Sequence, residues 1–125
     1  MQWPNSYDVL ITENLFGDIL TDEASVISGS MGLMPSASVG EQTSLFEPIH
    51  GSFPQAAGKD IANPLATVLS AAMLFEMAFG FKEEAHCIRN VVDFSLYKGI
   101  VSEDLANEGK AYRTSEIGDF LASNI

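Results

Sequence analysis

NPLATVLSAAMLFEMAFG, residues 63–80, is the most apolar run of the chain, and the other elements can be arranged around it. Asn63 is a helix cap and Pro64 suits the first helical position, so the pattern predicts a helix from Leu65 to Phe79 that closes at Gly80. Glu76 interrupts the run, which is shorter than the roughly 20 apolar residues of a membrane span. We therefore expect a buried core helix.

Two further helices are predicted after this core helix. The first runs from about Lys82 to Lys98, and one face of it carries Ala85, Ile88, Val92 and Leu96. Residues 102–113 form a polar connection, and Thr114 caps a last short helix. That helix is expected to pack through Ile117, Phe120 and Leu121.

Before the core helix, residues 7–11 (YDVLI) have the composition of a short, mostly buried strand. A helix follows, with Asn14 as its N-cap and its end near Gly29. Its apolar contacts are expected from Leu15, Phe16, Ile19, Leu20, Val26 and Ile27.

Glycine and proline punctuate the middle of the chain, which leaves room only for brief strands such as residues 44–47. The chain thus divides into a strand and helix (residues 1–30), a Gly/Pro-rich segment (31–64) and a helical part (65–125). This order predicts an α/β fold in which helices cover short strands. So few strands make an incomplete sheet, and further strands are expected from sequence outside this chain.

Charge and cysteine content exclude several classes of function. Six Lys and Arg residues face 17 Asp and Glu residues, a net charge of −11. Such a surface repels nucleic acids and anionic membranes, so neither is an expected partner. The single Cys87 cannot form an internal disulfide, and the first residues lack the features of a signal peptide. We expect a cytoplasmic protein.

Asp18 and Asp22 are four residues apart on a predicted helix, which places them on one face with Cβ atoms about 5–6 Å apart. Two carboxylates so placed suit Mg²⁺ or Mn²⁺, which fill their other positions with water and substrate oxygens. The alternative is an acidic face on a solvated helix. Spacing alone favours this alternative, because such pairs are common.

A glycine-bracketed loop leads to the core helix. It comprises His50, Gly51, Ser52, Phe53, Pro54, Gln55, Ala56, Ala57, Gly58, Lys59, Asp60, Ile61, Ala62 and Asn63. Glycines allow close backbone approach to a ligand, and a helix N-terminus favours anions. The spacing does not match a P-loop, and there is no Gly-x-Gly-x-x-Gly fingerprint. An ordered surface loop is the alternative.

Two long motifs in this order resemble the isocitrate/3-isopropylmalate dehydrogenase family. They are NLFGDILTDEAS (14–25) with GSMGLMPSAS (29–38), and LFEPIHGS (45–52) running into GKDIANP (58–64). The second motif and the tail RTSEIGD (113–119) are closer to the isopropylmalate branch than to the isocitrate branch. The resemblance covers essentially the whole chain and maps it onto the C-terminal part of a longer family protein.

The resemblance implies oxidative decarboxylation of 3-isopropylmalate in leucine biosynthesis, with hydride transfer to NAD. Asp18 and Asp22 match the family's metal-binding aspartates, so Mg²⁺ or Mn²⁺ is the implied ion. Residues 50–63 match the cofactor loop, with His50 beside the adenine. The family also implies a homodimer whose metal site takes a carboxylate from the other subunit.

Other features depart from the family pattern. Gln55 stands where many NAD-specific members carry an aspartate, which leaves the choice between NAD and NADP open. The family's catalytic lysine and tyrosine and its substrate-binding arginines are expected upstream of this chain, so no catalytic residue is assigned here and the chain alone is expected to be inactive. Arg89 and Arg113 look like surface residues. Action on isocitrate, tartrate or homoisocitrate, or a noncatalytic nucleotide-binding or interaction role, are the alternatives.

Overall fold

The computed structural model describes residues 3–106 and 109–125. Four α-helices are joined by short 3-10 turns and one pair of strands in this part of the chain. In order, the elements are η1 (Pro4–Ser6), α1 (Asn14–Ser28), η2 (Met31–Leu33), β1 (Pro35–Ser38), β2 (Leu45–Pro48), η3 (Pro54–Ala56), α2 (Leu65–Met77), α3 (Lys82–Lys98) and α4 (Thr114–Ala122). None of the helices in these residues is both long enough and apolar enough to cross a membrane.

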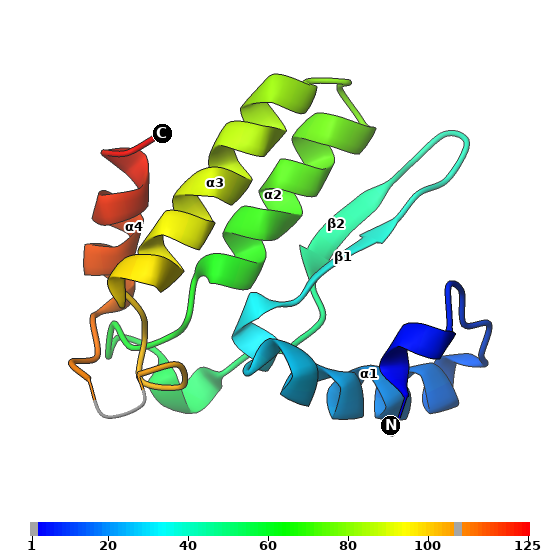
Figure 1. Cartoon of the computed structure of the whole chain (residues 1–125), viewed down its shortest axis with the longest axis horizontal. Coiled ribbons are helices and arrows are strands. Elements are labelled where there is room, and N and C mark those ends of the chain that lie inside the picture. Colours follow the sequence, from blue (N-terminus) through cyan, green and yellow to red (C-terminus); the bar gives the residue numbers. More distant parts are fainter. Residues whose placement is uncertain (1–2, 107–108) are drawn as a thin grey trace.

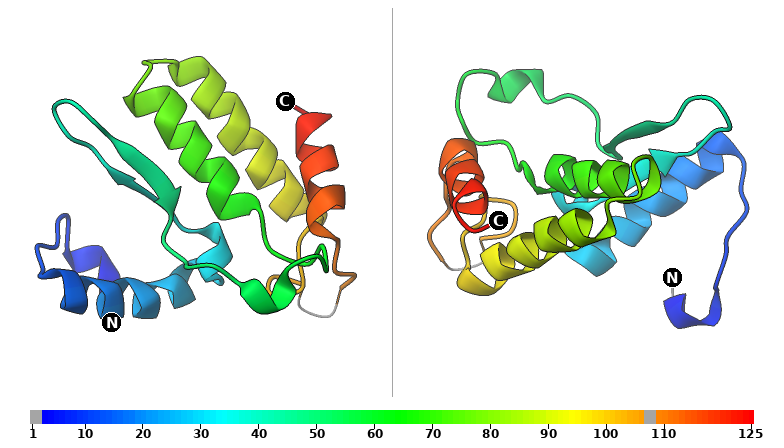
Figure 2. Two further views of the ribbon diagram at one scale, coloured as in Figure 1. Left: turned by 180° about the vertical axis from the view of Figure 1, so that it is seen from behind. Right: turned by 90° about the horizontal axis from the view of Figure 1, so that it is seen from above.

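Helix α2 lies between the strand pair and α3, and α4 packs on the far side of α3 (Figure 1). Helix α1 extends away from this layer, and its C-terminal end adjoins η2 (Figure 2). Strands β1 and β2 are antiparallel, with Pro35 opposite Pro48 and Ser38 opposite Leu45. The result is the expected α/β arrangement, in which helices cover a small and incomplete sheet.

The core forms where α2, α3 and α4 meet. Its largest cluster comprises Leu65, Val91, Val92, Ile117 and Leu121, and Leu65 and Ile117 are completely buried. A second cluster, Ala72, Ala85 and Ile88, joins α2 and α3 farther along. Small residues at these positions let the two helix backbones approach closely, which is why the apolar run at 63–80 can lie at the centre.

The predicted strand at residues 7–11 is wrong. No strand is assigned there, and its apolar side chains are exposed, with Ile11 97% accessible. A strand requires hydrogen bonds to a neighbouring strand, and the described residues offer none. Helix α1 does form, but its predicted apolar contacts do not: Leu15, Phe16, Ile19, Leu20, Val26 and Ile27 are all exposed.

The helix ends differ from prediction by one or two residues. Glu13, not Asn14, is the N-cap of α1, and α2 ends at Met77, before Phe79. Helix α4 begins at Thr114, with Arg113 as its N-cap. The bounds of α3 are confirmed, but Leu96 is exposed, and Val91 and Ser95 take its place on the buried face.

Candidate functional site

Two cavities meet at His50 and Gly51, which line both. The first, of about 780 Å³, lies along the loop at residues 50–63 and is called the loop cavity. The second, of about 730 Å³, lies against α1 and is called the acidic cavity. Because they share two residues, ligands in the two cavities would be neighbours.

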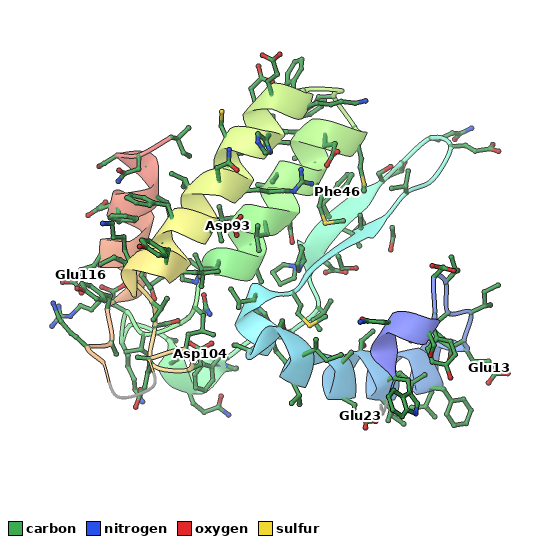
Figure 3. The ribbon with its side chains drawn as sticks, viewed as in Figure 1. Glu13, Glu23, Phe46, Asp93, Asp104 and Glu116 are labelled. Atoms are coloured by element: carbon green, nitrogen blue, oxygen red, sulfur yellow. The ribbon has the colours of Figure 1, made fainter. Side chains whose placement is uncertain are left out.

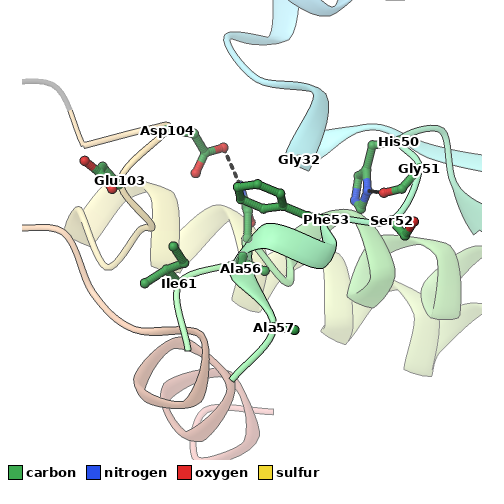
Figure 4. Close-up of a pocket in the computed structure, with 12 residues that line it drawn as sticks. Gly32, His50, Gly51, Ser52, Phe53, Ala56, Ala57, Ile61, Glu103 and Asp104 are labelled. Atoms are coloured by element: carbon green, nitrogen blue, oxygen red, sulfur yellow. Dashed lines mark hydrogen bonds between the residues drawn. The ribbon is translucent and has the colours of Figure 1, made fainter. Parts of the chain in front are cut away.

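Most of the predicted cofactor loop faces the loop cavity (Figure 4). The cavity is lined by His50, Gly51, Ser52, Phe53, Ala56, Ala57, Ile61, Ala62 and Asn63 from the loop, and by Gly32, Glu103 and Asp104 from elsewhere. Of the fourteen predicted positions, Pro54, Gln55, Gly58, Lys59 and Asp60 do not line it. The cavity is therefore a mainly apolar slot with polar groups at its edges.

His50 offers an unused hydrogen-bonding atom where the cavities meet. Its Nδ1 lies 3.0 Å from the carbonyl oxygen of Gly51, and its Nε2 is buried without a partner among the described residues. A carbonyl only accepts hydrogen bonds, so Nδ1 donates in this contact. In the neutral ring, Nε2 is then an acceptor available to a ligand.

Asn63 shapes the end of the loop. Its Oδ1 accepts a hydrogen bond from the backbone nitrogen of Leu65 at 3.0 Å, and its Nδ2 donates to Oδ2 of Asp104 at 2.9 Å. Asn63 thus satisfies a backbone donor at the start of α2, as predicted, but the predicted positions are wrong by one residue: Pro64 is the N-cap and Leu65 is the first helical residue. Both polar atoms of the Asn63 side chain therefore have partners inside the protein. Asn63 lines the cavity as part of its wall, with these atoms already engaged.

Asp60 is engaged away from the cavity, at the start of α4. Its two carboxylate oxygens accept from the backbone nitrogen of Ser115 at 2.9 Å and from its hydroxyl at 2.5 Å. These two hydrogen bonds, with a smaller contribution from the nearby Arg113, lower the pKa of Asp60. Asp60 also has φ of 58°, in the left-handed region. Asp60 thus links the loop to α4 through hydrogen bonds.

Asp18 and Asp22 both line the acidic cavity, as do Glu13 and Glu47. Both aspartates are exposed on α1, and their hard oxygen donors suit Mg²⁺ or Mn²⁺. Within residues 3–106 and 109–125, however, no three His, Cys, Asp or Glu side chains are grouped so that they could hold an ion. The pair fits a cation as two of its ligands, and water, substrate or another chain would complete the coordination.

Among the residues that the structure describes, no Lys or Arg lines either cavity. Arg89, expected at the surface, is half-buried and forms an ion pair with Glu76 that joins α3 to α2. Arg113, at the start of α4, is exposed. The charged side chains that line the two cavities in the described part of the chain are therefore acidic.

Three polar residues of this region were not predicted from the sequence. Glu103 and Asp104 reach the loop cavity from the connection between α3 and α4, and Ser30 hydrogen-bonds to Asp104. Asp104 lies 41 positions from Asn63 and 74 positions from Ser30, to both of which it is hydrogen-bonded. No local spacing could have indicated them.

The comparisons with known proteins agree on one family. The family model described as isocitrate/isopropylmalate dehydrogenase matches residues 1–121. A 3-isopropylmalate dehydrogenase from Bacteroides fragilis is 56% identical over 100% of this chain and 35% of its own length. One from Aquifex aeolicus is 46% identical over 98% of this chain and 34% of its own length.

Solved structures show the same relationship. The isocitrate dehydrogenase of Methylococcus capsulatus superimposes with a TM-score of 0.89 at 38% identity, over 97% of this chain and 35% of that one. A β-decarboxylating dehydrogenase from Thermococcus kodakarensis gives a TM-score of 0.79 at 40% identity, over 93% of this chain and 33% of that one.

The chain belongs to the isocitrate/isopropylmalate dehydrogenase family. It spans about a third of the length of the curated relatives it matches.

Proposed function

We propose that this chain forms the cofactor wall and part of the metal site of an NAD-dependent 3-isopropylmalate dehydrogenase. The reaction is the oxidative decarboxylation of 3-isopropylmalate to 2-oxoisocaproate in leucine biosynthesis. The observation that carries the proposal is the junction of the loop cavity with the acidic cavity at His50 and Gly51. Hydride transfer requires the dinucleotide and the metal-bound substrate to be neighbours, and two adjoining cavities support that arrangement.

The loop cavity suits the nucleotide end of NAD. Phe53, Ala56 and Ile61 supply apolar surface for a flat base. The free Nε2 of His50 is an acceptor, and the exocyclic amine of adenine is a donor. Gln55 lies outside the cavity wall, whereas Glu103 and Asp104, the charged residues of that wall, are both acidic. Their charge disfavours the additional phosphate of NADP, so NAD is the proposed cofactor.

Asp18 and Asp22 are the proposed metal ligands. They belong to one turn of α1, and the side chains around them keep the cavity acidic. When bound, the dinucleotide supplies a hydride acceptor and the divalent cation supplies positive charge for the oxygens of the hydroxy acid. An anionic substrate would need that positive charge here, because neither cavity is lined by Lys or Arg among the described residues.

Complete catalysis requires groups that the described residues do not bring to the cavities. A dicarboxylate calls for convergent guanidinium groups, and proton transfer calls for a general acid and base. We propose that other sequence of the same protein, and a second subunit of a homodimer, supply them. The 125-residue chain by itself is then inactive.

The first experiment is to determine the mass of the natural polypeptide that contains residues 14–22 in its source cell, and to purify that polypeptide. Turnover is then compared on 3-isopropylmalate, isocitrate, tartrate and homoisocitrate with NAD and Mg²⁺. The proposal predicts the highest kcat/KM on 3-isopropylmalate. Preference for another acid would move the protein to a neighbouring branch, and turnover by the isolated 125-residue chain would contradict the incomplete site.

The metal site is tested separately by Mn²⁺ binding, followed by electron paramagnetic resonance. Asp22→Asn is expected to weaken Mn²⁺ binding by at least about tenfold, or 1.4 kcal/mol. Asp93→Asn is the matched control, because Asp93 is an exposed aspartate of α3 outside both cavities. Equal Mn²⁺ affinity in the Asp22 and Asp93 variants would argue against the metal site.

A further inference from the structure

One carboxylate joins three separate parts of the chain beside the loop cavity. Oδ2 of Asp104 accepts hydrogen bonds from the hydroxyl of Ser30 and from Nδ2 of Asn63, and Oδ1 accepts from the hydroxyl of Ser102 at 2.6 Å. Ser30 follows the end of α1, Asn63 ends the cofactor loop, and Ser102 begins the connection after α3. Figure 4 shows Asp104 facing the loop across the cavity.

Each partner is held in place by a second contact. Ser102 is completely buried, which anchors Asp104 to the core. The oxygen of Ser30 accepts from the backbone nitrogen of Gly32 at 3.0 Å and so caps η2. Asn63 caps the start of α2 through Leu65. Movement of Asp104 would therefore be passed to the end of α1 and to the loop.

Gly32 and Asn63 are tightly packed beside these hydrogen bonds. A Cβ atom added to Gly32 would lie 2.5 Å from Nδ2 of Asn63, closer than real contacts allow. The turn after α1 and the end of the loop are thus in direct contact where Asp104 binds both. Although partial burial raises the pKa of Asp104, hydrogen bonds from Ser102, Ser30 and Asn63 outweigh it and lower that pKa. The carboxylate is ionised at neutral pH, when it accepts these hydrogen bonds best.

We propose that Asp104 is a positioning residue that holds the helix bearing Asp18 and Asp22 in register with the cofactor loop, and that it thereby couples metal binding to dinucleotide binding. The inference rests on the proposed function for the identity of the two ligands. Its geometric part, the joining of Ser30 and Gly32 to Asn63, stands without it.

The geometric part is tested by amide hydrogen exchange on the natural polypeptide that contains this chain. Asp104→Ala is expected to raise exchange in residues 30–34 and 61–65 together, because both lose the same acceptor. Asp93→Asn provides the control, since Asp93 lies on α3 at a distance from Asp104 (Figure 3). Unchanged exchange in either segment of folded Asp104→Ala would overturn the proposal.

The coupling is tested by measuring the Kd of Mn²⁺ with and without saturating NAD. The wild type is expected to bind Mn²⁺ about fivefold more tightly when NAD is bound, and by linkage NAD more tightly when Mn²⁺ is bound. Asp104→Ala is expected to reduce this roughly fivefold ratio of Kd values to about one. Asp104→Asn keeps one carbonyl acceptor and is expected to retain part of the ratio. If Asp104 were merely structural, its substitution would lower Tm and leave the ratio of Kd values unchanged, and that result would overturn the proposed coupling. A wild-type ratio of one would overturn it as well.

If Asp104→Ala does not fold, Ser30→Ala replaces it. This variant removes the hydrogen bond from Ser30 to Asp104 and the cap of η2 that the same hydroxyl provides, but it leaves the Asp104 contacts with Asn63 and Ser102 in place. It is expected to lower the coupling ratio at least about twofold. An unchanged ratio in folded Ser30→Ala would contradict the proposal. Loss of turnover on every hydroxy acid, with the Mn²⁺ and NAD coupling intact, would refute the proposed function and leave the role of Asp104 standing.

Discussion

At the scale of single residues, Gly32 is required by close packing. Its added Cβ would meet three atoms of Asn63 within 2.8 Å. Gly32→Ala is therefore expected to destabilise the chain by about 1–3 kcal/mol, measured by urea unfolding. Gly118→Ala is the control, because Gly118 lies in α4 with open space around its Cα and no positive φ. That change is expected to stabilise by roughly 0.5–1 kcal/mol, and equal destabilisation by both variants would contradict the packing argument.

Glu103 is expected to contribute to cofactor choice through its charge. It lines the loop cavity, is exposed, and contributes negative charge to a wall whose described residues include no basic side chain. Repulsion between two charges a few Å apart in water is about 1 kcal/mol, which is roughly fivefold in binding. Glu103→Gln is therefore expected to lower the KM for NADP by up to about fivefold and to leave the KM for NAD nearly unchanged. Equal changes in both KM values would show that the charge of Glu103 does not repel the additional phosphate of NADP.

At the scale of elements, α4 depends on a side chain from the loop. The Asp60 carboxylate accepts two hydrogen bonds from Ser115, and its backbone oxygen accepts one from Thr114 at 3.0 Å. The hydroxyl of Thr114 in turn donates to the carbonyl oxygen of Ala62 at 2.6 Å. Helix α4 and the cofactor loop are thus joined by four hydrogen bonds, all donated by the first two residues of α4 and accepted by the loop.

The contribution of Asp60 is expected to depend on pH. Its pKa is lowered in the folded chain from an ordinary value of 3.8, so the stability it contributes is fully present above that value. It is lost as the pH falls through the lower pKa of the folded state. Asp60→Asn, which tolerates the left-handed backbone, should reduce stability and α4 amide protection at pH 7, and the difference from wild type should shrink below about pH 3.8. A difference that is constant between pH 7 and pH 3 would argue against this role.

At the scale of the whole molecule, the exposed apolar face of α1 is the largest departure from an ordinary domain. Leu15 and Ile19 lie one turn apart on it and are 67% and 55% accessible. The isolated 125-residue chain is therefore expected to self-associate in light scattering. The double variant Leu15→Lys/Ile19→Lys should reduce association. It should do so even though it makes the net charge of −11 less negative and thereby weakens the general repulsion between chains.

Tyr97→Lys is the control for that experiment, because Tyr97 is exposed on α3, away from α1. It should leave association unchanged. A monodisperse wild-type chain would contradict the prediction and would favour the noncatalytic module, which requires a stable short protein.

The sequence alone was enough to predict the helices, and the physical reason is that their signals are local. Apolar periodicity, Gly99 in the left-handed conformation after α3, and the Asn63 cap all act within a few residues. The fold class and the family follow from such contiguous patterns, and the comparisons confirm them. The strand at residues 7–11 failed for the opposite reason, because a strand needs a partner that local composition cannot supply.

Only the tertiary structure decided how the site is assembled. It joined the two cavities at His50, turned Asp60 from the cofactor loop to α4, and brought Ser30, Asn63 and Asp104 together. These contacts connect residues that are 41 to 74 positions apart. Their free energy depends on where packing places whole elements, so no property of the local sequence specifies them.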